Sequence, residues 1–232
     1  MKEVRNWLLA LDELFFPRPL ECVFCGERPG TDLGPCRTCL DSLAIAWQRM
    51  EVQGYPCFSL VPYRGFARDL IHKMKYHGGY RIAQGFSRLL GLALREELSV
   101  SRSGLLVPVP LHASRLEKRG FNHAALLADG ISKVWRLPVS SRVVRVRPTK
   151  PQSGLTASQR RRNLRGAFAL VPGENWQGRQ IVIVDDVITS GYTFSTVADL
   201  AAAQGGRPLG VFVARTEMDG GGKDSVEKLQ TV

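Results

Sequence analysis

The residues best suited to chemistry follow one another in a single stretch. An apolar, β-branched run over 181–184 ends in Asp185 and Asp186, and a turn rich in hydroxyl groups follows shortly after. That turn consists of Thr189, Ser190, Gly191, Tyr192 and Thr193. Ligands of an open α/β sheet bind beyond the carboxyl ends of its strands, and a turn that opens a helix offers N–H groups to a phosphate. The pattern therefore favours a phosphate-binding turn, with the two acids placed near sugar hydroxyls or Mg²⁺. The alternative, that these residues only cap a helix, fits each of them singly better than it fits the whole string.

A second group that could do chemistry is a set of four cysteines with the spacing C-x2-C-x10-C-x2-C. Its members are Cys22, Cys25, Cys36 and Cys39. Two CxxC turns complete a tetrahedron of thiolates around Zn²⁺, and a site whose four ligands are all protein groups is structural. Redox pairs or buried thiols are the alternative, but paired CxxC turns in an intracellular chain favour zinc. Cys57, the fifth cysteine, is expected to be a small buried apolar residue.

The third feature is an excess of positive charge. The 232 residues carry 32 Lys and Arg against 21 Asp and Glu, a net charge of +11, which points to a nucleic acid or a small polyphosphate as partner. The range 140–166 contributes eight basic residues and no acid. Within it, the loop over 147–165 is predicted either to close over a bound phosphate or to track single-stranded DNA. The loop has no aromatic residue on which bases could stack, so we favour a lid.

These groups need a scaffold, and the hydrophobic pattern supplies one. Helices are predicted over 4–16, 39–49, 65–76, 81–98, 121–136 and 193–204. Strands are predicted over 57–63, 105–109, 139–146, 166–171, 180–184 and 208–214. Strands separated by helices and buried on both faces indicate an α/β fold with a mostly parallel sheet flanked by helices.

The same pattern suggests how the chain is divided. We predict an N-terminal helix and four-cysteine zinc-finger module over 1–53, an α/β domain over 54–217 and a disordered tail over 218–232. No apolar run approaches the roughly 20 residues that a membrane span needs, so no membrane insertion is expected. The best candidate for a secretion signal, 7–11, is cut short by Asp12 and Glu13, and a cytoplasmic protein is therefore expected.

The motifs also carry a resemblance. The run from Ile181 to Thr193 resembles the phosphoribosyl pyrophosphate (PRPP) motif of type I phosphoribosyltransferases, with Ser190 in place of a threonine. The rest of the chain, from about 10 to 215, resembles the ComF family, which includes ComFC and GntX-like proteins. The matching motifs are the four-cysteine knuckle, Tyr63-Arg-Gly, Lys75-Tyr76, Val107-Pro-Val-Pro110, Arg119-Gly-Phe-Asn122, Arg147-x-Thr149-x-x-Gln152 and Arg162-Asn163-Leu164-x-Gly166-Ala-Phe168.

The resemblance implies a type I phosphoribosyltransferase-like fold and a PRPP site. The turn 189–193 would hold the 5-phosphate, and Asp185 and Asp186 would act as the catalytic pair on the ribose hydroxyls. Lys75 and Tyr76 are candidates for contact with a base or a phosphate. The diphosphate and the lid would involve Arg115, Arg119, Arg147, Lys150, Gln152 and Arg162.

The implied reaction is transfer of ribosyl 5-phosphate from PRPP, with Mg²⁺, to an acceptor that the sequence does not identify, releasing pyrophosphate. His112 and His123 lie near the diphosphate loop, but lone histidines are more typical of structural roles, so no general base is assigned. The family is linked to competence, DNA uptake and transformation. Two alternatives therefore stay open: a non-catalytic PRPP- or nucleotide-binding regulator, and a transformation factor that contacts single-stranded DNA or a competence helicase.

Overall fold

The computed structural model describes residues 21–76, 79–97, 104–148, 159, 163–216 and 225–227. The predicted helix over 4–16 lies outside these ranges. Within them, every helix falls short of the length and apolarity that crossing a bilayer requires.

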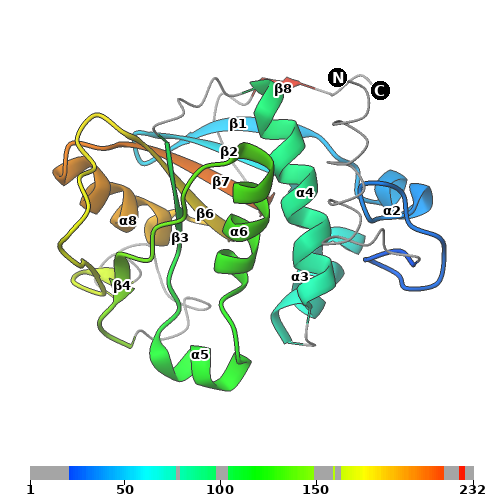
Figure 1. Ribbon diagram of the computed structural model, residues 1–232, viewed down its shortest axis with the longest axis horizontal. Coiled ribbons are helices and arrows are strands. Elements are labelled where there is room, and N and C mark those ends of the chain that lie inside the picture. The colour runs from blue at the N-terminus through cyan, green and yellow to red at the C-terminus, as the bar shows by residue number, and fades with distance from the viewer. Residues whose placement is uncertain are drawn as a thin grey trace, which may run out of the picture.

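The described residues form a six-stranded sheet in the order β3-β6-β7-β2-β1-β8 (Figure 1). Its strands are β1 (Trp47–Val52), β2 (Tyr55–Pro62), β3 (Leu105–Pro108), β6 (Gln180–Ile188), β7 (Arg207–Arg215) and β8 (Ser225–Glu227). The pairs β3–β6, β6–β7 and β7–β2 are parallel, while β1 is antiparallel to both β2 and β8. The predicted mostly parallel sheet is therefore confirmed.

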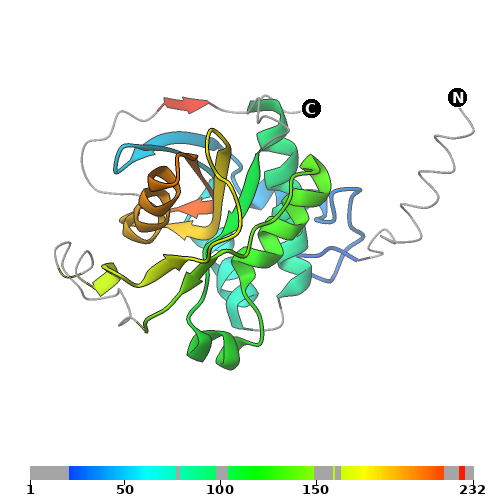
Figure 2. The ribbon, with the colours of Figure 1, turned by 60° about the vertical axis from the view of Figure 1, so that its left-hand side comes forward.

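Helices cover both faces of this sheet (Figures 1 and 2). One face packs against α3 (Gly65–Tyr76), α4 (Tyr80–Glu97) and α6 (His123–Trp135), and the other against α8 (Tyr192–Ala203). The central strand β6 is apolar on both sides: Val182 and Val184 belong to the core under α3, α4 and α6, whereas Ile181 and Ile183 belong to the core under α8. This burial on both faces explains the near-continuous apolar run that marks the strand in the sequence.

The predicted helix over 39–49 is wrong at its C-terminal half. The helix there is α2 (Arg37–Ser42), and the chain then enters β1 at Trp47. Gln53 and Gly54 both have positive φ, of 54° and 84°, which suits the tight turn of a β-hairpin, so β1 turns directly into β2. The predicted division of the chain at residue 53 falls in this turn, so the last strand of the range 1–53 pairs with the first strand of the α/β domain.

Other elements differ from expectation near the sheet's ends. The predicted strand over 139–146 is reduced to a single parallel bridge between Val139 and Leu106 and the short strand β4 (Val143–Arg145), which pairs with β5 (Phe168–Leu170). A short helix that the sequence pattern did not predict, α5 (Ala113–Arg119), precedes α6. Within the range 218–232, predicted to be disordered, residues 225–227 form β8.

The cysteine module shares a hydrophobic core with the sheet and its helices. Val23 and Phe24, between the first two cysteines, are buried in the same cluster as α4, and the rings of Phe24 and Phe86 lie 4.9 Å apart between centroids. Gly85 of α4 faces this contact, since a Cβ there would lie 2.7 Å from both Phe24 Cε1 and Val23 Cγ2. The knuckle therefore sits on the helix only because Gly85 has no side chain.

We predict that Gly85→Ala lowers the free energy of unfolding by about 1–3 kcal/mol, because a methyl group is forced into a close-packed contact. In an open helical position the same change would stabilise by up to about 1 kcal/mol, so the sign of the effect is diagnostic. Urea unfolding measures it, with Gln84→Ala on the preceding residue as control, expected within about 0.5 kcal/mol of wild type. An unchanged or raised stability for Gly85→Ala would show that the knuckle does not pack as described.

Candidate functional site

The acidic pair lies at the point on β6 where one neighbouring strand, β3, has ended and the other, β7, continues. β3 pairs with β6 only as far as Val184, whereas β7 continues alongside it to Ile188. Asp185 and Asp186 are therefore still in a strand, which continues past its predicted end at residue 184, and they emerge beyond the end of β3. Val139 pairs with β3 on the side away from β6. The connections that follow β3 and β6 therefore run in opposite directions along the sheet. Such a point in a parallel sheet is where ligands bind.

The turn 189–193 leads into α8 as predicted. Gly191 is the residue that caps the helix, with φ of 71°, and a glycine offers no side-chain oxygen to the helix N-terminus. The Cβ of any other residue at 191 would collide with Val52 of the β1–β2 hairpin. Among the described residues, the buried Ser190 Oγ finds no hydrogen-bond partner. A buried hydroxyl without a partner costs free energy, so this turn is suited to receive a hydrogen-bonding ligand.

The two acids point to different sides of the strand, because side chains alternate along β6. Asp185 shares the side of Ile183 and lines a small cavity together with the turn that contains Thr189 and Gly191. Its Oδ1 accepts a hydrogen bond from the Asp186 N–H at 2.9 Å. Asp186 is 5% exposed and lies on the side of α3 and α6. The pair is thus divided between a carboxylate at the cavity and a carboxylate in the protein interior.

Asp186 is held by protein groups on both of its oxygens. Oδ1 accepts the Val187 N–H at 2.8 Å, while Oδ2 lies 2.5 Å from Lys75 Nζ and 3.5 Å from His123 Nε2. Burial works against the charged form, but His123 and Lys75 outweigh it, and the pKa of Asp186 falls below its usual range. Burial likewise opposes the charge of Lys75, yet Asp186 holds the pKa of that ammonium above its ordinary value. Asp186 and Lys75 therefore form a buried ion pair.

Asp185 lies in the opposite situation. Burial, and next the negative charge of Asp186, raise its pKa to about 7, and His123, the Asp186 N–H and Lys75 compensate only in part. Its Oδ1 is 3.9 Å from His123 Nε2. A carboxylate that the protein leaves partly uncompensated is the one better placed to receive a ligand's hydroxyl groups or cation.

Arg119 and Tyr76 meet beside this pair. The guanidinium lies 5.0 Å above the Tyr76 ring, and its Nη2 donates to the Tyr76 hydroxyl at 3.2 Å. The ring of His72 also contacts Tyr76, with centroids 4.9 Å apart. Tyr76 is half exposed, but the Arg119 guanidinium covers one face of its ring and His72 contacts it as well, so its stacking on a base stays a prediction.

The other predicted contacts with a diphosphate are distributed differently. Arg115 lies on α5 near Arg145 of β4: burial, together with the charge of Arg115, lowers the pKa of Arg145. Arg147 Nη2 donates to the carbonyl oxygens of Asn163 and Arg165, at 3.1 and 2.8 Å, and so ties together the two ends of the predicted lid. Lys150, Gln152 and Arg162 lie outside the described residues. Their role, like that of the other predicted site residues, stays a prediction.

Two residues at the site were not assigned from the sequence. His123, expected to be structural, is 4% exposed and contacts both acids, and Arg145 contributes a cation near Asp185. The sequence does hold a signal for the first: His123 directly follows Asn122, whose side chain caps α6 by accepting the Ala124 N–H. His123 is therefore the first residue of α6, and this helix start lies beside Asp186 of the central strand β6.

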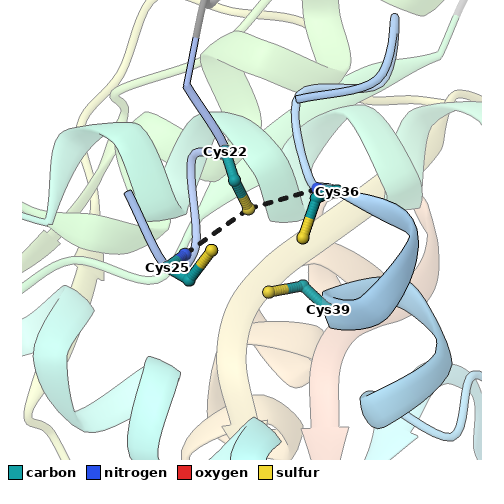
Figure 3. A group of neighbouring side chains, drawn as sticks. All are labelled: Cys22, Cys25, Cys36 and Cys39. Carbon is teal, nitrogen blue, oxygen red and sulfur yellow. Dashed lines mark hydrogen bonds between the residues drawn. The ribbon is translucent and has the colours of Figure 1, made fainter. Parts of the chain in front are cut away.

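The four predicted zinc ligands come together in a cluster of their own (Figure 3). The sulfur atoms lie within 4.8 Å of one another, with Cys39 provided by α2 and the other three by the preceding loop. Burial acts against the thiolate of Cys22, but N–H groups of Cys25, Cys36 and Phe24 donate to its sulfur and lower its pKa to about 6. Converging sulfurs with N–H···S hydrogen bonds fit a structural Zn²⁺.

This fold and site define an α/β protein with an acidic pair and a hydroxyl-rich turn at the strand ends, joined to a four-cysteine module. Sequence comparison identifies proteins related to this chain. The chain is 33% identical over 195 residues to competence protein F of Haemophilus influenzae, covering 82% of this chain and 80% of the relative. It is 34% identical over 196 residues to DNA utilization protein YhgH of Escherichia coli K12, covering 82% of both, and 25% identical over 184 residues to competence protein ComFC of Bacillus subtilis, covering 76% of this chain and 69% of the relative. The chain therefore belongs to the ComF family of competence protein F, YhgH and ComFC.

Two further comparisons add little. A scan against protein-family models finds no match. A crystal structure of an adenine phosphoribosyltransferase aligns over 78% of this chain and 89% of its own, with 14% identity and a TM-score of 0.39.

We predict that the cysteine cluster binds one Zn²⁺ per chain and that removing it with a chelator lowers the melting temperature, because Val23 and Phe24 are then no longer fixed on α4. Elemental analysis and a thermal melt with and without chelator measure both effects. Cys36→Ser should lose the metal, whereas Cys57→Ala, which removes a buried thiol outside the cluster, should keep it. Equal metal content in the two variants would refute the assignment.

Substitution of the two adjacent acids should change the stability of the protein in opposite directions. Asp185 has a folded pKa raised to about 7, so between about pH 4 and 7 the folded state holds a proton that the unfolded state lacks, and this group's contribution to stability falls as pH rises. Asp185→Asn should therefore become more stabilising across that window, by on the order of 1–2 kcal/mol at pH 8.

Asp186→Asn should do the reverse. Because the folded pKa of Asp186 is depressed, its pairing stabilises the protein above the unfolded pKa and is lost on acidification. The variant leaves Lys75 buried without its partner and should cost about 3 kcal/mol at pH 7. Unfolding by urea at pH 5 and pH 8 measures both variants, and effects of the same sign at pH 8 would contradict the division of the pair.

Proposed function

We propose that this protein binds PRPP at the carboxyl end of β6 and acts in the uptake or use of DNA, as the names of its relatives indicate for them. The 5-phosphate is received by the turn 189–193, the ribose hydroxyls by Asp185, and the diphosphate by basic side chains that include Arg115 and Arg119. Asp186 and Lys75 support the site from the interior.

The observation that carries the proposal is the state of Ser190. Its hydroxyl is buried without a partner in the described part of the chain, in a turn where Gly191 leaves the start of α8 without a side-chain cap. A phosphate oxygen would satisfy that hydroxyl, and it would also be stabilised by the positive end of the α8 dipole.

If the protein is an enzyme, the reaction transfers ribosyl 5-phosphate to a nucleophile. The C1–O bond to the diphosphate breaks as positive charge develops on the ribose ring, and the nucleophile bonds to C1 while pyrophosphate leaves with the electron pair. Mg²⁺ bound with PRPP would neutralise the diphosphate. The chain's own residues contribute position and charge: the turn fixes the phosphate end, Asp185 orients the ribose, and the arginines attract the leaving group. A regulator that binds PRPP without turnover would use the same contacts.

A second candidate function is the handling of single-stranded DNA. It is supported by the DNA utilization named for YhgH and by the basic residues of 140–166. A surface that neutralises phosphates binds DNA with an affinity that falls steeply as salt concentration rises. This surface and the PRPP site are compatible in one molecule.

We predict that wild-type protein binds PRPP with Mg²⁺ in calorimetry and that Ser190→Ala weakens this binding about tenfold, through loss of one hydrogen bond to a charged group. Because the Ser190 hydroxyl has no partner in the described structure, its removal should leave the melting temperature of the free protein unchanged or higher. Ser195→Ala is the matched control: its hydroxyl donates to the Tyr192 carbonyl in the same helix, so PRPP binding should persist. Absence of heat from wild-type protein would refute the proposal.

Two measurements separate the remaining alternatives. Release of pyrophosphate across a panel of nucleobases distinguishes an enzyme from a regulator. Salt-dependent binding of single-stranded DNA that survives in Asp185→Asn would place the DNA surface apart from the acidic pair, whereas its loss would join the two.

A further inference from the structure

His123 occupies a position that gives it two defined neighbours. It is the first residue of α6 and is almost completely buried. Asn122, the preceding residue, holds this helix start in place: its Nδ2 donates to the Val109 carbonyl at the end of β3 at 3.0 Å, and its Oδ1 caps the helix. The ring nitrogens face opposite ways: Nδ1 is 3.5 Å from Arg119 Nη1, and Nε2 is 3.5 Å from Asp186 Oδ2.

These contacts determine which nitrogen carries the proton. A guanidinium has N–H donors and no acceptor, so the Arg119 contact requires Nδ1 to be unprotonated and to accept. A neutral imidazole with an unprotonated Nδ1 carries its proton on Nε2, the nitrogen that lies 3.5 Å from Asp186 Oδ2. Arg119 decides the tautomer because a proton on Nδ1 would point at a cation.

The chain of contacts continues at both ends. Asp186 is paired with Lys75, and Arg119 Nη2 donates to the hydroxyl of Tyr76, the neighbour of Lys75 in the chain. The five residues Lys75, Asp186, His123, Arg119 and Tyr76 thus close a ring of contacts. This ring joins the end of α3, the end of α5, the start of α6 and β6, and His123 is the member that links the arginine to the acid.

We propose that His123 is a positioning residue of the ligand site: as the Nε2–H tautomer it accepts from Arg119 and donates to Asp186, and so fixes the arginine on the diphosphate side relative to the acidic pair on the ribose side. The inference deepens the proposed function and rests on it for the identity of the ligand. His123 does not touch the ligand. It holds the two groups at one spacing, so that a ligand with its phosphates and its hydroxyls at the matching separation meets both without reorganisation.

The protonation state is tested on the free protein by ¹⁵N NMR of the imidazole side chains at pH 7.5. The chain has four histidines, so the His123 signals are assigned by their loss in His123→Gln. We expect Nδ1 to give the shift of an unprotonated nitrogen and Nε2 that of an N–H. Arg119→Met should allow both tautomers. An imidazolium with two protons, or a proton on Nδ1, would overturn the proposal.

The positioning role is tested by PRPP calorimetry on three variants of differing chemistry. His123→Asn keeps an acceptor for Arg119 and His123→Gln keeps a donor for Asp186, so each should lose about tenfold in affinity. His123→Phe keeps the ring volume and loses both contacts, and should lose about a hundredfold. If His123 only fills space, the phenylalanine variant will bind PRPP better than either amide variant, and that ranking would sink the idea.

The outcomes remain distinguishable from those of the proposed function. Should wild-type protein fail to bind PRPP, the ligand assignment fails, and the NMR result still decides whether the chain of contacts from Arg119 through His123 to Asp186 exists. If His123→Phe does not fold, the comparison of the two amide variants with wild type decides: wild-type affinity in both would refute the positioning role.

Discussion

Lys75 and Asp186 place opposite charges 2.5 Å apart where water has little access, with their side chains 21% and 7% exposed. Removing two charges from water is costly, and such a pair persists only where further hydrogen bonds satisfy its remaining atoms. Here the Val187 N–H donates to Oδ1 of Asp186, and His123 Nε2 lies 3.5 Å from its Oδ2. The pair fixes the end of α3 against β6 and thereby sets where Tyr76 and Arg119 meet. The arrangement of the whole site follows from this contact.

The division of the two acids shows how a binding site is kept ready at the expense of stability. Asp186 is paired with Lys75 and belongs to the interior, whereas Asp185 is left with a raised pKa beside the cavity. The unpartnered Ser190 hydroxyl is a second example of an incompletely satisfied group in the described structure. Groups that the fold leaves in this condition are candidates for ligand contact, since a ligand can restore what folding removed.

The sequence predicts those features whose residues are close together in the chain and misses those formed by residues that meet only in the folded protein. The knuckle and the run from Ile181 to Thr193 were recognised because their residues are neighbours in the chain. The ring around His123 was missed, since Lys75, Arg119, His123 and Asp186 meet only after α3, α5, α6 and β6 have packed. The extension of β6 through both acids depends on pairing with β7, which the pattern of one strand does not reveal. The hairpin signal of Gln53-Gly54 was present and was outweighed by the helical pattern before it.

The shared core of the knuckle, α4 and β1 bears on how this family can evolve. Val23, Phe24 and Trp47 are buried with residues of α4, and β1 forms an antiparallel neighbour of β2. Deleting the first 53 residues would uncover that apolar surface and leave β2 as an open edge, ready to pair with other chains. The cysteine module therefore cannot be exchanged or lost like an independent cassette. Any lineage that loses the four cysteines must at the same time replace the packing of Val23 and Phe24 on α4.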